Sequence, residues 1–286
     1  MKVAIFGISG QLGSDVAAAL ASHDGTPIDE TRADIRDERI VIDTVREAAP
    51  EWVINCAAMT NVEGCERDPL AAFDVNALGA GHVARAAEAA GARLVHISTD
   101  YVFDGKRREP YHENDLPRPL NIYGASKLAG EWAVRAATHG ALIVRTTGLY
   151  GFHACLGKGT NFVETMVKRA QSGAPTRVVN DEILTPTFTV DLAAQLRALV
   201  ERDAAPGVYH ATNAGACSWF EFAREIFALC GAERMPEPIP AAEWKSPVRR
   251  PAFSVLAHRA LAELDLDIMP PWRDALARYM TGRKDI

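Results

Sequence analysis

The sequence predicts an α/β protein with a doubly wound parallel sheet, followed by a smaller and more irregular C-terminal domain. Up to Tyr150 of the 286-residue chain, short apolar runs rich in β-branched residues alternate with alanine-rich stretches. Such alternation specifies parallel strands joined by crossover helices. A glycine-rich turn also lies between the first apolar run and the first alanine-rich stretch. Ligands of open parallel sheets bind at turns of this kind.

Each element follows from this alternation in chain order. The predicted strands cover residues 3–6, 52–55, 94–97 and 142–144, and the predicted helices cover residues 14–22, 70–90 and 125–137. Beyond Tyr150 prolines punctuate the chain, and only two helices are predicted there, over residues 162–171 and 271–280. We therefore predict one domain over residues 1–148 and a second mainly over residues 149–286, with part of residues 176–212 returning to the sheet.

Composition excludes several classes of function. The formal net charge is −6 and the isoelectric point about 5.8, so no nucleic-acid partner is expected, because such binding relies on a basic surface. The N-terminal apolar run is too short for a signal peptide, and nowhere do ~18 apolar residues follow one another, which predicts a cytoplasmic protein without a membrane partner. The five cysteines are widely spaced and form no CxxC pair, which predicts reduced thiols and no metal site.

The glycine-rich turn reads Gly7-Ile8-Ser9-Gly10-Gln11-Leu12-Gly13. Between a strand and a helix, glycines bring backbone N–H groups and the positive end of the helix dipole against a pyrophosphate, where a Cβ would intrude. The spacing is GxxGxxG rather than GxGxxG, so the position directly after the first strand carries the prediction of a Rossmann-type dinucleotide-binding domain. The predicted cofactor contacts in this turn are Gly7, Gly10, Gln11 and Leu12.

The sequence leaves the choice between NADH and NADPH open. An acidic residue ~20 positions beyond the loop favours the free ribose of NADH, whereas an arginine favours the 2′-phosphate of NADPH. Asp29 and Asp34 offer the first arrangement and Arg32 the second. All three are candidate cofactor contacts, and the predicted cofactor is NADPH or NADH.

Tyr123 and Lys127 form the candidate catalytic pair. Four residues apart on a helix, a phenol and an ammonium share one face about one turn apart. A cation ~5 Å from a phenol, at an effective dielectric of ~20, stabilises the phenolate by ~3 kcal/mol, so we expect the pKa of Tyr123 to fall from ~10 by roughly two units. A phenol in that range can serve as a general acid near neutral pH.

A third catalytic group follows the apolar run that ends in Ser98-Thr99-Asp100-Tyr101. Side chains at the carboxyl ends of parallel strands lie where open sheets bind their ligands. We expect Thr99 to hydrogen-bond the carbonyl oxygen that Tyr123 protonates, while Lys127 also holds the nicotinamide ribose. Asp100 and Tyr101 are candidate substrate contacts at the same edge.

The glycine turn, the strand-terminal Ser-Thr and the YxxxK pair, at these intervals, resemble the extended short-chain dehydrogenase/reductase family. Within it, the chain resembles the dTDP-4-dehydrorhamnose reductases along nearly its whole length. The matching stretches include residues 10–13, 55–62, 98–103, 123–131, 159–163, 185–187, 218–226, 250–256 and 271–272.

The resemblance implies an activity, which is the NAD(P)H-dependent reduction of the C4 keto group of a nucleotide-activated 6-deoxy-4-keto sugar. It implies that the second domain holds this sugar nucleotide, with Asn161 and Arg250 as candidates for its diphosphate. A guanidinium is the usual bidentate partner of phosphate oxygens. A homodimer is the assembly to test.

Further site residues come from the same resemblance. The additional cofactor contacts that it implies are Ala57, Ala58 and Thr60. Asn76 matches a helical asparagine of the family that supports the active-site hydrogen bonds.

Two other functions use a similar scaffold. A nucleotide-sugar 4-epimerase also relies on Thr, Tyr and Lys, and the regulatory subunit of methionine adenosyltransferase binds its partner without needing that trio. The intact trio of Thr99, Tyr123 and Lys127 favours an enzyme. A dehydratase is unlike this chain, because the residue after Asp100 is Tyr101 rather than a carboxylate.

The chain departs from the family at two places beside the sugar. Family members usually carry a tryptophan in the stretch Arg-Thr-Ser-Trp, whereas this chain has Arg145-Thr146-Thr147-Gly148. The family's usual Asp-Gln-x-Gly is replaced here by Asp181-Glu182-Ile183-Leu184. These changes leave the identity of the sugar and of the nucleotide open.

Overall fold

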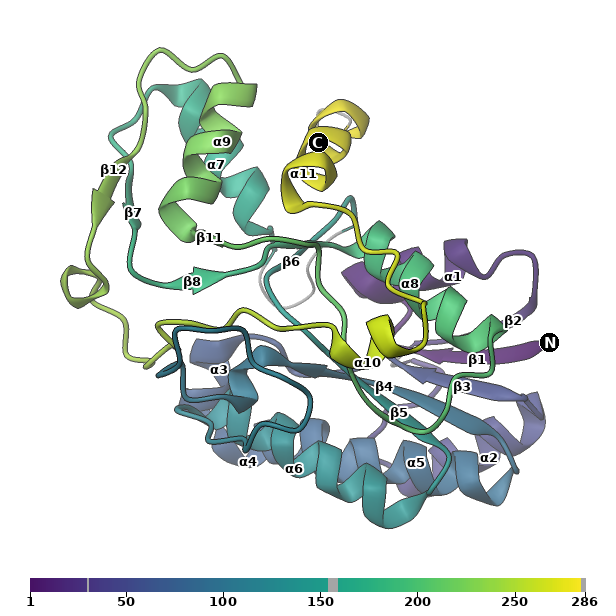
Figure 1. Cartoon of the computed structure of the whole chain (residues 1–286). Helices are drawn as coiled ribbons and strands as arrows, with labels where there is room; N and C mark the ends of the chain where they lie inside the picture. Colours follow the sequence, from purple (N-terminus) through teal and green to yellow (C-terminus); the bar gives the residue numbers. More distant parts are fainter. Residues whose placement is uncertain (30, 154–158, 284–286) are drawn as a thin grey trace.

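Figure 1 shows a lobe built around a parallel sheet, with a smaller lobe above it. The computed structural model describes residues 1–29, 31–153 and 159–283. Among these residues the main sheet has six strands in the order β10-β5-β4-β3-β1-β2, and every neighbouring pair is parallel. Its strands are β1 (Lys2–Phe6), β2 (Asp24–Ile28), β3 (Trp52–Asn55), β4 (Arg93–Thr99), β5 (Ala141–Thr146) and β10 (Gly207–His210). The predicted α/β class with a Rossmann-type, doubly wound parallel sheet is confirmed.

Helices cover both faces of the sheet (Figure 1). One face packs against α1 (Gln11–Ala19), α8 (Thr189–Glu201) and α10 (Arg259–Glu263), and the other against α2 (Glu38–Ala48), α5 (Ala80–Ala89) and α6 (Ile122–Ala137). Successive residues of β1 enter opposite cores: Val3 and Ile5 pack with α1 and α8, whereas Ala4 and Phe6 pack with α2 and α5. A strand buried on both faces has no polar side, which explains its continuous apolar run.

The strand order places a crevice beside β1. From β1 the chain crosses to β2 on one side and then to β3 on the other, so the connections leave the sheet in opposite directions at this point. Backbone hydrogen bonds join the strand ends next to this crevice. The Gly7 amide donates to the Ile28 carbonyl, and the Cys56 amide donates to the Phe6 carbonyl. Ligands of open α/β sheets bind at such a switch point, outside the carboxyl ends of the strands.

The helix predicted over residues 70–90 is present but interrupted. It consists of α4 (Pro69–Phe73), a π-helical segment (Asp74–Gly79) and α5, and the short α3 (Val62–Arg67) precedes it. The π-helical segment contains Asn76, whose side chain is buried. Single π-helical turns inside helices often occur at functional sites.

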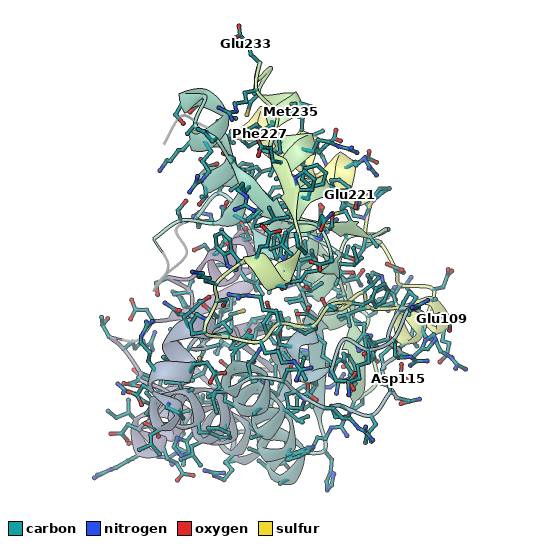
Figure 2. All side chains as sticks on the ribbon, turned by 90° about the vertical axis from the view of Figure 1, so that its left-hand side faces the viewer. Glu109, Asp115, Glu221, Phe227, Glu233 and Met235 are labelled. Atoms are coloured by element: carbon teal, nitrogen blue, oxygen red, sulfur yellow. The ribbon has the colours of Figure 1, made fainter. Side chains whose placement is uncertain are left out.

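The smaller lobe has an aromatic core. Its helices are α7 (Phe162–Ser172), α9 (Trp219–Leu229) and α11 (Trp272–Gly282), and buried Tyr150, Phe222 and Tyr279 pack between them. In Figure 2, Phe227 lies in this lobe and Glu233 at its far end, while Asp115 lies at the side of the larger lobe. Short strand pairs frame the lobe: β6 (Leu149–Tyr150) with β9 (Thr187–Phe188), β7 (Arg177–Val179) with β12 (Glu237–Ile239), and β8 (Ile183–Leu184) with β11 (Cys217–Ser218).

The segment over residues 176–212 contributes to both lobes. Its first part supplies β7, β8 and β9 to the smaller lobe, and its last part supplies α8 and β10 to the sheet lobe. The division of function between residues 1–148 and 149–286 stays a prediction, because it depends on where ligands bind.

The described residues contain neither a membrane-spanning helix nor a cluster of metal-binding side chains. No helix in them is both long enough and apolar enough to cross a membrane. No disulfide joins the described cysteines Cys56, Cys65, Cys217 and Cys230, and Cys155 lies outside the described residues. In those same ranges no three His, Cys, Asp or Glu side chains gather as a metal site would require.

Candidate active site

One cavity of about 660 Å³ runs from the glycine turn to the smaller lobe. Most of the predicted site residues line it: Gly7, Gly10, Gln11, Leu12, Asp29, Asp34, Ala57, Ala58, Thr60, Thr99, Asp100, Tyr101, Tyr123, Lys127 and Asn161. Of the cofactor and substrate contacts that the sequence predicts, Arg32 and Arg250 do not line it, and neither does Asn76, the predicted supporting residue. The cavity therefore brings together segments that are far apart in the sequence.

The glycine turn has the form of a phosphate cradle. Gly7 has a φ of +75°, and a Cβ there would lie 2.6 Å from the backbone nitrogen of Ala57. The next helix, α1, begins at Gln11. Its N-cap residue is Gly10, and among the described residues no side chain forms a capping hydrogen bond there. Uncapped N–H groups and the helix dipole favour an anion at this point. The turn thus fits the pyrophosphate of a dinucleotide.

Gln11 also ties the turn to the smaller lobe. Its side-chain amide donates to the carbonyl oxygens of Gly151 and His153, at 3.2 Å each. The side chain is therefore engaged with the protein, and the contact that Gln11 offers to a cofactor comes from its backbone at the helix N-terminus. This contact stays a prediction.

The end of the cavity beside β2 has a different arginine from the one that the sequence indicated. Arg32 points away and donates to the Pro27 carbonyl at 3.4 Å. Arg36 lines the cavity instead, and its guanidinium holds the pKa of the Asp34 carboxyl below its usual value through a bidentate contact, with Nε 3.0 Å from Oδ1 and Nη2 2.5 Å from Oδ2. Sequence reasoning missed Arg36, although its place two residues after Asp34 was a usable signal. Both NADH-type and NADPH-type features are present.

Tyr123 and Thr99 meet at the opposite end of the cavity. Tyr123 stands in the first turn of α6, which Asn121 caps by accepting a hydrogen bond from the Gly124 amide at 2.8 Å. Thr99 ends β4, and its hydroxyl hydrogen-bonds the Tyr123 side chain. The Tyr101 ring lies edge-on to the Tyr123 ring, with centroids 5.6 Å apart. The phenol is thereby fixed against the strand end.

Lys127 is buried one turn further along α6. Its ammonium donates to the Ile97 carbonyl of β4 at 2.6 Å, and it lines the same cavity as Tyr123. Burial lowers the pKa of Lys127 from 10.5 to about 8, while the nearby Glu131 carboxylate acts in the opposite direction. The ammonium is therefore still the prevailing form at neutral pH.

The predicted lowering of the Tyr123 pKa is wrong for this arrangement. Burial raises the pKa of Tyr123 well above 10, and the hydrogen bond to Thr99 offsets only part of that rise. Lys127 is not among the described groups that shift it. Burial removes the water that would stabilise the Tyr123 phenolate, and this loss raises the pKa. A cation that is already bound to a backbone carbonyl does not make up for it. The phenol accordingly stays protonated at neutral pH, which is the form that donates a proton.

The side chain of Asn76 connects two segments next to this end of the cavity. Its amide accepts from the Met59 backbone at 2.8 Å and donates to the Ser126 hydroxyl at 3.0 Å. Ser126 in turn donates to the Tyr123 carbonyl at 2.8 Å. The π-helical segment of Asn76 is thus linked to the first turn of α6, as expected for a residue that positions the site.

The comparisons with known proteins give one family. The family described as RmlD substrate binding domain matches residues 1–284. The dTDP-4-dehydrorhamnose reductase of Mycobacterium tuberculosis is 39% identical over 98% of this chain and 93% of its own length. The chain belongs to the dTDP-4-dehydrorhamnose reductase family. The predicted family is confirmed, and the protein is an oxidoreductase of the short-chain dehydrogenase/reductase type.

Two further proteins are similar to this chain along nearly their whole length. The spore coat polysaccharide biosynthesis protein SpsK of Bacillus subtilis is 40% identical, with 99% of this chain and 98% of that protein covered. The crystal structure of the Bacillus anthracis reductase in complex with NADP superposes with a TM-score of 0.92, at 39% identity and 98% coverage of each chain.

Two residues implied by the family resemblance have partners within the protein. Asn161 caps α7, and its side-chain amide donates to the Gly151 carbonyl at 3.0 Å. Arg250 pairs with the Glu63 carboxylate and donates to the Ser246 hydroxyl at 2.6 Å. A diphosphate that took up either group would have to exchange these contacts, so their role in substrate binding stays a prediction.

Asp100 is the most buried carboxyl group of the site. Its oxygens accept from the Thr99 hydroxyl at 3.0 Å and from the Thr147 hydroxyl at 2.8 Å, and Ser254 adds a further hydrogen bond. Burial nevertheless raises the pKa of Asp100 from 3.8 to about 6. Thr147 and Ser254 are site residues that sequence reasoning missed, because they come from separate segments that only the fold brings together.

The raised pKa of Asp100 gives a testable pH dependence of stability. A carboxyl with a raised folded-state pKa stabilises the fold fully below pH 3.8 and loses that contribution as the pH rises through about 6, which amounts to about 3 kcal/mol. We expect the free energy of unfolding in urea to fall more between pH 4 and pH 7 for the native protein than for Asp100→Asn. Equal falls in the two proteins would show that Asp100 does not titrate in this range.

Proposed function

We propose that the protein uses NADPH or NADH to reduce the C4 keto group of a dTDP-linked 6-deoxy-4-keto sugar, with Tyr123 as the proton donor. The observation that carries this proposal is the cavity that joins the open N-terminus of α1 to Tyr123 and to the buried Thr99 and Lys127. Two relatives support the substrate class: the M. tuberculosis protein is named a dTDP-4-dehydrorhamnose reductase, and a relative from Streptomyces niveus, 40% identical, a dTDP-4-keto-6-deoxy-D-glucose reductase.

The cofactor would be held mainly by backbone. The glycine turn would receive the pyrophosphate, Asp29 and Arg36 would border the adenosine, and Ala57, Ala58 and Thr60 line the same cavity. When bound, the reduced nicotinamide supplies the hydride for the keto carbon. The side chain of Lys127, one turn from Tyr123, would hold the nicotinamide ribose in place of its present contact with the Ile97 carbonyl.

The proton transfer depends on Tyr123 and Thr99. The phenol of Tyr123 is protonated at neutral pH, so it can hydrogen-bond the keto oxygen and pass its proton as negative charge develops there. The Thr99 hydroxyl, now shared between Tyr123 and Asp100, would turn to the same oxygen. Asn76 and Ser126 keep the first turn of α6 in register with the strand end.

A panel of dTDP-, UDP- and GDP-linked 4-keto-6-deoxy sugars tests the proposal. We expect the protein to oxidise NADPH or NADH with the dTDP-linked sugars, in a ratio of one cofactor to one sugar. The loss of cofactor absorbance measures this oxidation. Interconversion of sugars without net consumption of reduced cofactor would identify a 4-epimerase. Binding without any turnover would favour a regulatory subunit. Sedimentation of the same sample tests the predicted homodimer.

A further inference from the structure

The two departures from the family sequence lie against each other in space. Gly148 follows β5, whereas Leu184 ends β8 in the smaller lobe, 36 positions later in the chain. A Cβ at position 148 would lie 2.9 Å from the Cδ1 atom of Leu184. The leucine side chain therefore occupies the space into which a side chain at position 148 would project.

Position 148 is closed to larger residues in this chain for further reasons. Gly148 has a φ of +58°, which residues with a Cβ adopt only with strain. The same added Cβ would lie 3.2 Å from the Cα atom of Pro186. A tryptophan here, as the family usually has, would strain the backbone and displace the Leu184 side chain, so the loss of that wall is matched by the gain of a leucine.

A short series of contacts connects this pair to the reaction centre. Thr147, directly before Gly148, donates to Asp100, and Asp100 accepts from Thr99, the hydrogen-bond partner of Tyr123. From the other side, the Ser254 backbone donates to the Ile183 carbonyl at 2.8 Å, and the Ser254 side chain hydrogen-bonds Asp100. Leu184 lines the cavity and is 4% exposed.

We propose that Leu184 is the specificity-determining residue of the sugar subsite, forming from β8 the apolar wall that the family usually builds from the residue at position 148. This inference rests on the proposed function, because it assumes that a sugar occupies this end of the cavity. The wall is aliphatic and lies on a strand rather than in the turn after β5. Glu182, two residues earlier, lines the same cavity and provides a carboxylate beside the wall.

The wall has a direct test in ligand binding without turnover. Calorimetry measures the affinities of NADPH, of dTDP and of a dTDP-linked 6-deoxyhexose for the native protein and for Leu184→Ala. We expect the variant to bind the dTDP-sugar about tenfold more weakly, because it loses apolar contact with the sugar. Affinities for dTDP and NADPH should stay within about twofold, since neither ligand carries the sugar.

Leu266→Ala is the matched control. Leu266 is also buried, at 9% exposure, but it packs in the core under α8 and does not line the cavity. The control should lose stability comparably and bind all three ligands normally. Equal weakening of dTDP and dTDP-sugar by Leu184→Ala, or no weakening of either, would overturn the proposal. A native protein that binds the dTDP-sugar yet reduces no keto sugar would refute only the proposed reaction.

A double-mutant cycle tests the contact between the two positions. Gly148→Ala should shift the urea midpoint downward in the native background, through both backbone strain and collision with Leu184. In the Leu184→Ala background the backbone strain and the close approach to Pro186 remain but the collision with the leucine is gone, so the shift should be clearly smaller. Shifts that simply add would show that the two positions do not share space and would overturn the proposed exchange of walls.

Discussion

Replacing Tyr123 by phenylalanine is expected to lower kcat about a thousandfold, within the range of 10²–10⁴ that a positioned general acid contributes. The change removes the hydroxyl that hydrogen-bonds Thr99 and leaves the ring, which packs against Tyr101 with centroids 5.6 Å apart. The cavity and the glycine turn keep their shape. The affinity for NADPH, measured by fluorescence titration, should therefore stay close to that of the native protein.

Tyr111→Phe is the matched control for this prediction. Tyr111 is buried, its ring stacks on Phe103 at 4.2 Å between centroids, and its hydroxyl donates to Asp104 outside the cavity. The variant should lose this hydrogen bond and those that the hydroxyl accepts from the Lys106 and Arg107 amides, and retain nearly full turnover. If Tyr123→Phe kept kcat within about tenfold of the native value, the proton would have to come from another group. Asp100 is the next candidate in that case, since it is linked to the same hydroxyl of Thr99.

The parts of the site that the sequence predicted are those that local spacing determines. Gly7, Gly10 and Gln11 lie within five residues of one turn, and Tyr123 and Lys127 lie on one helix, so position alone brings each group together. The strand alternation likewise predicted the parallel sheet, because a strand buried on both faces must be apolar throughout.

The rest depended on contacts between distant segments. Arg36 faces the cavity while Arg32 turns away, although both stand in the same loop after β2. Thr147 and Ser254 reach Asp100 from either side only once β5 and the smaller lobe have packed. The pKa of Tyr123 was mispredicted for the same reason, since spacing gives the distance to a charge but does not give the loss of solvent. The π-helical turn at Asn76 had no sequence signal either.

Breaking the ion pair between Glu131 of α6 and Arg145 of β5 is expected to have the largest effect on stability. Their side chains are 4% and 2% exposed, and the guanidinium contacts the carboxylate through two hydrogen bonds of 2.8 and 2.7 Å. The Ser98 hydroxyl donates to the same carboxylate at 2.6 Å. Glu131→Leu leaves the buried guanidinium uncompensated, so the free energy of unfolding in urea should fall by about 3–5 kcal/mol.

The exposed pair of Arg259 and Glu263 provides the control, because its side chains are 67% and 62% exposed. Glu263→Leu should change stability by less than about 1 kcal/mol. Combining Glu131→Leu with Arg145→Met should recover most of the loss, since an apolar pair of similar volume leaves no buried charge alone. A double variant as unstable as Glu131→Leu would place the defect in packing instead. Because Glu131 supports the charge of Lys127 one turn away, recovered stability without recovered activity would separate folding from catalysis at this helix.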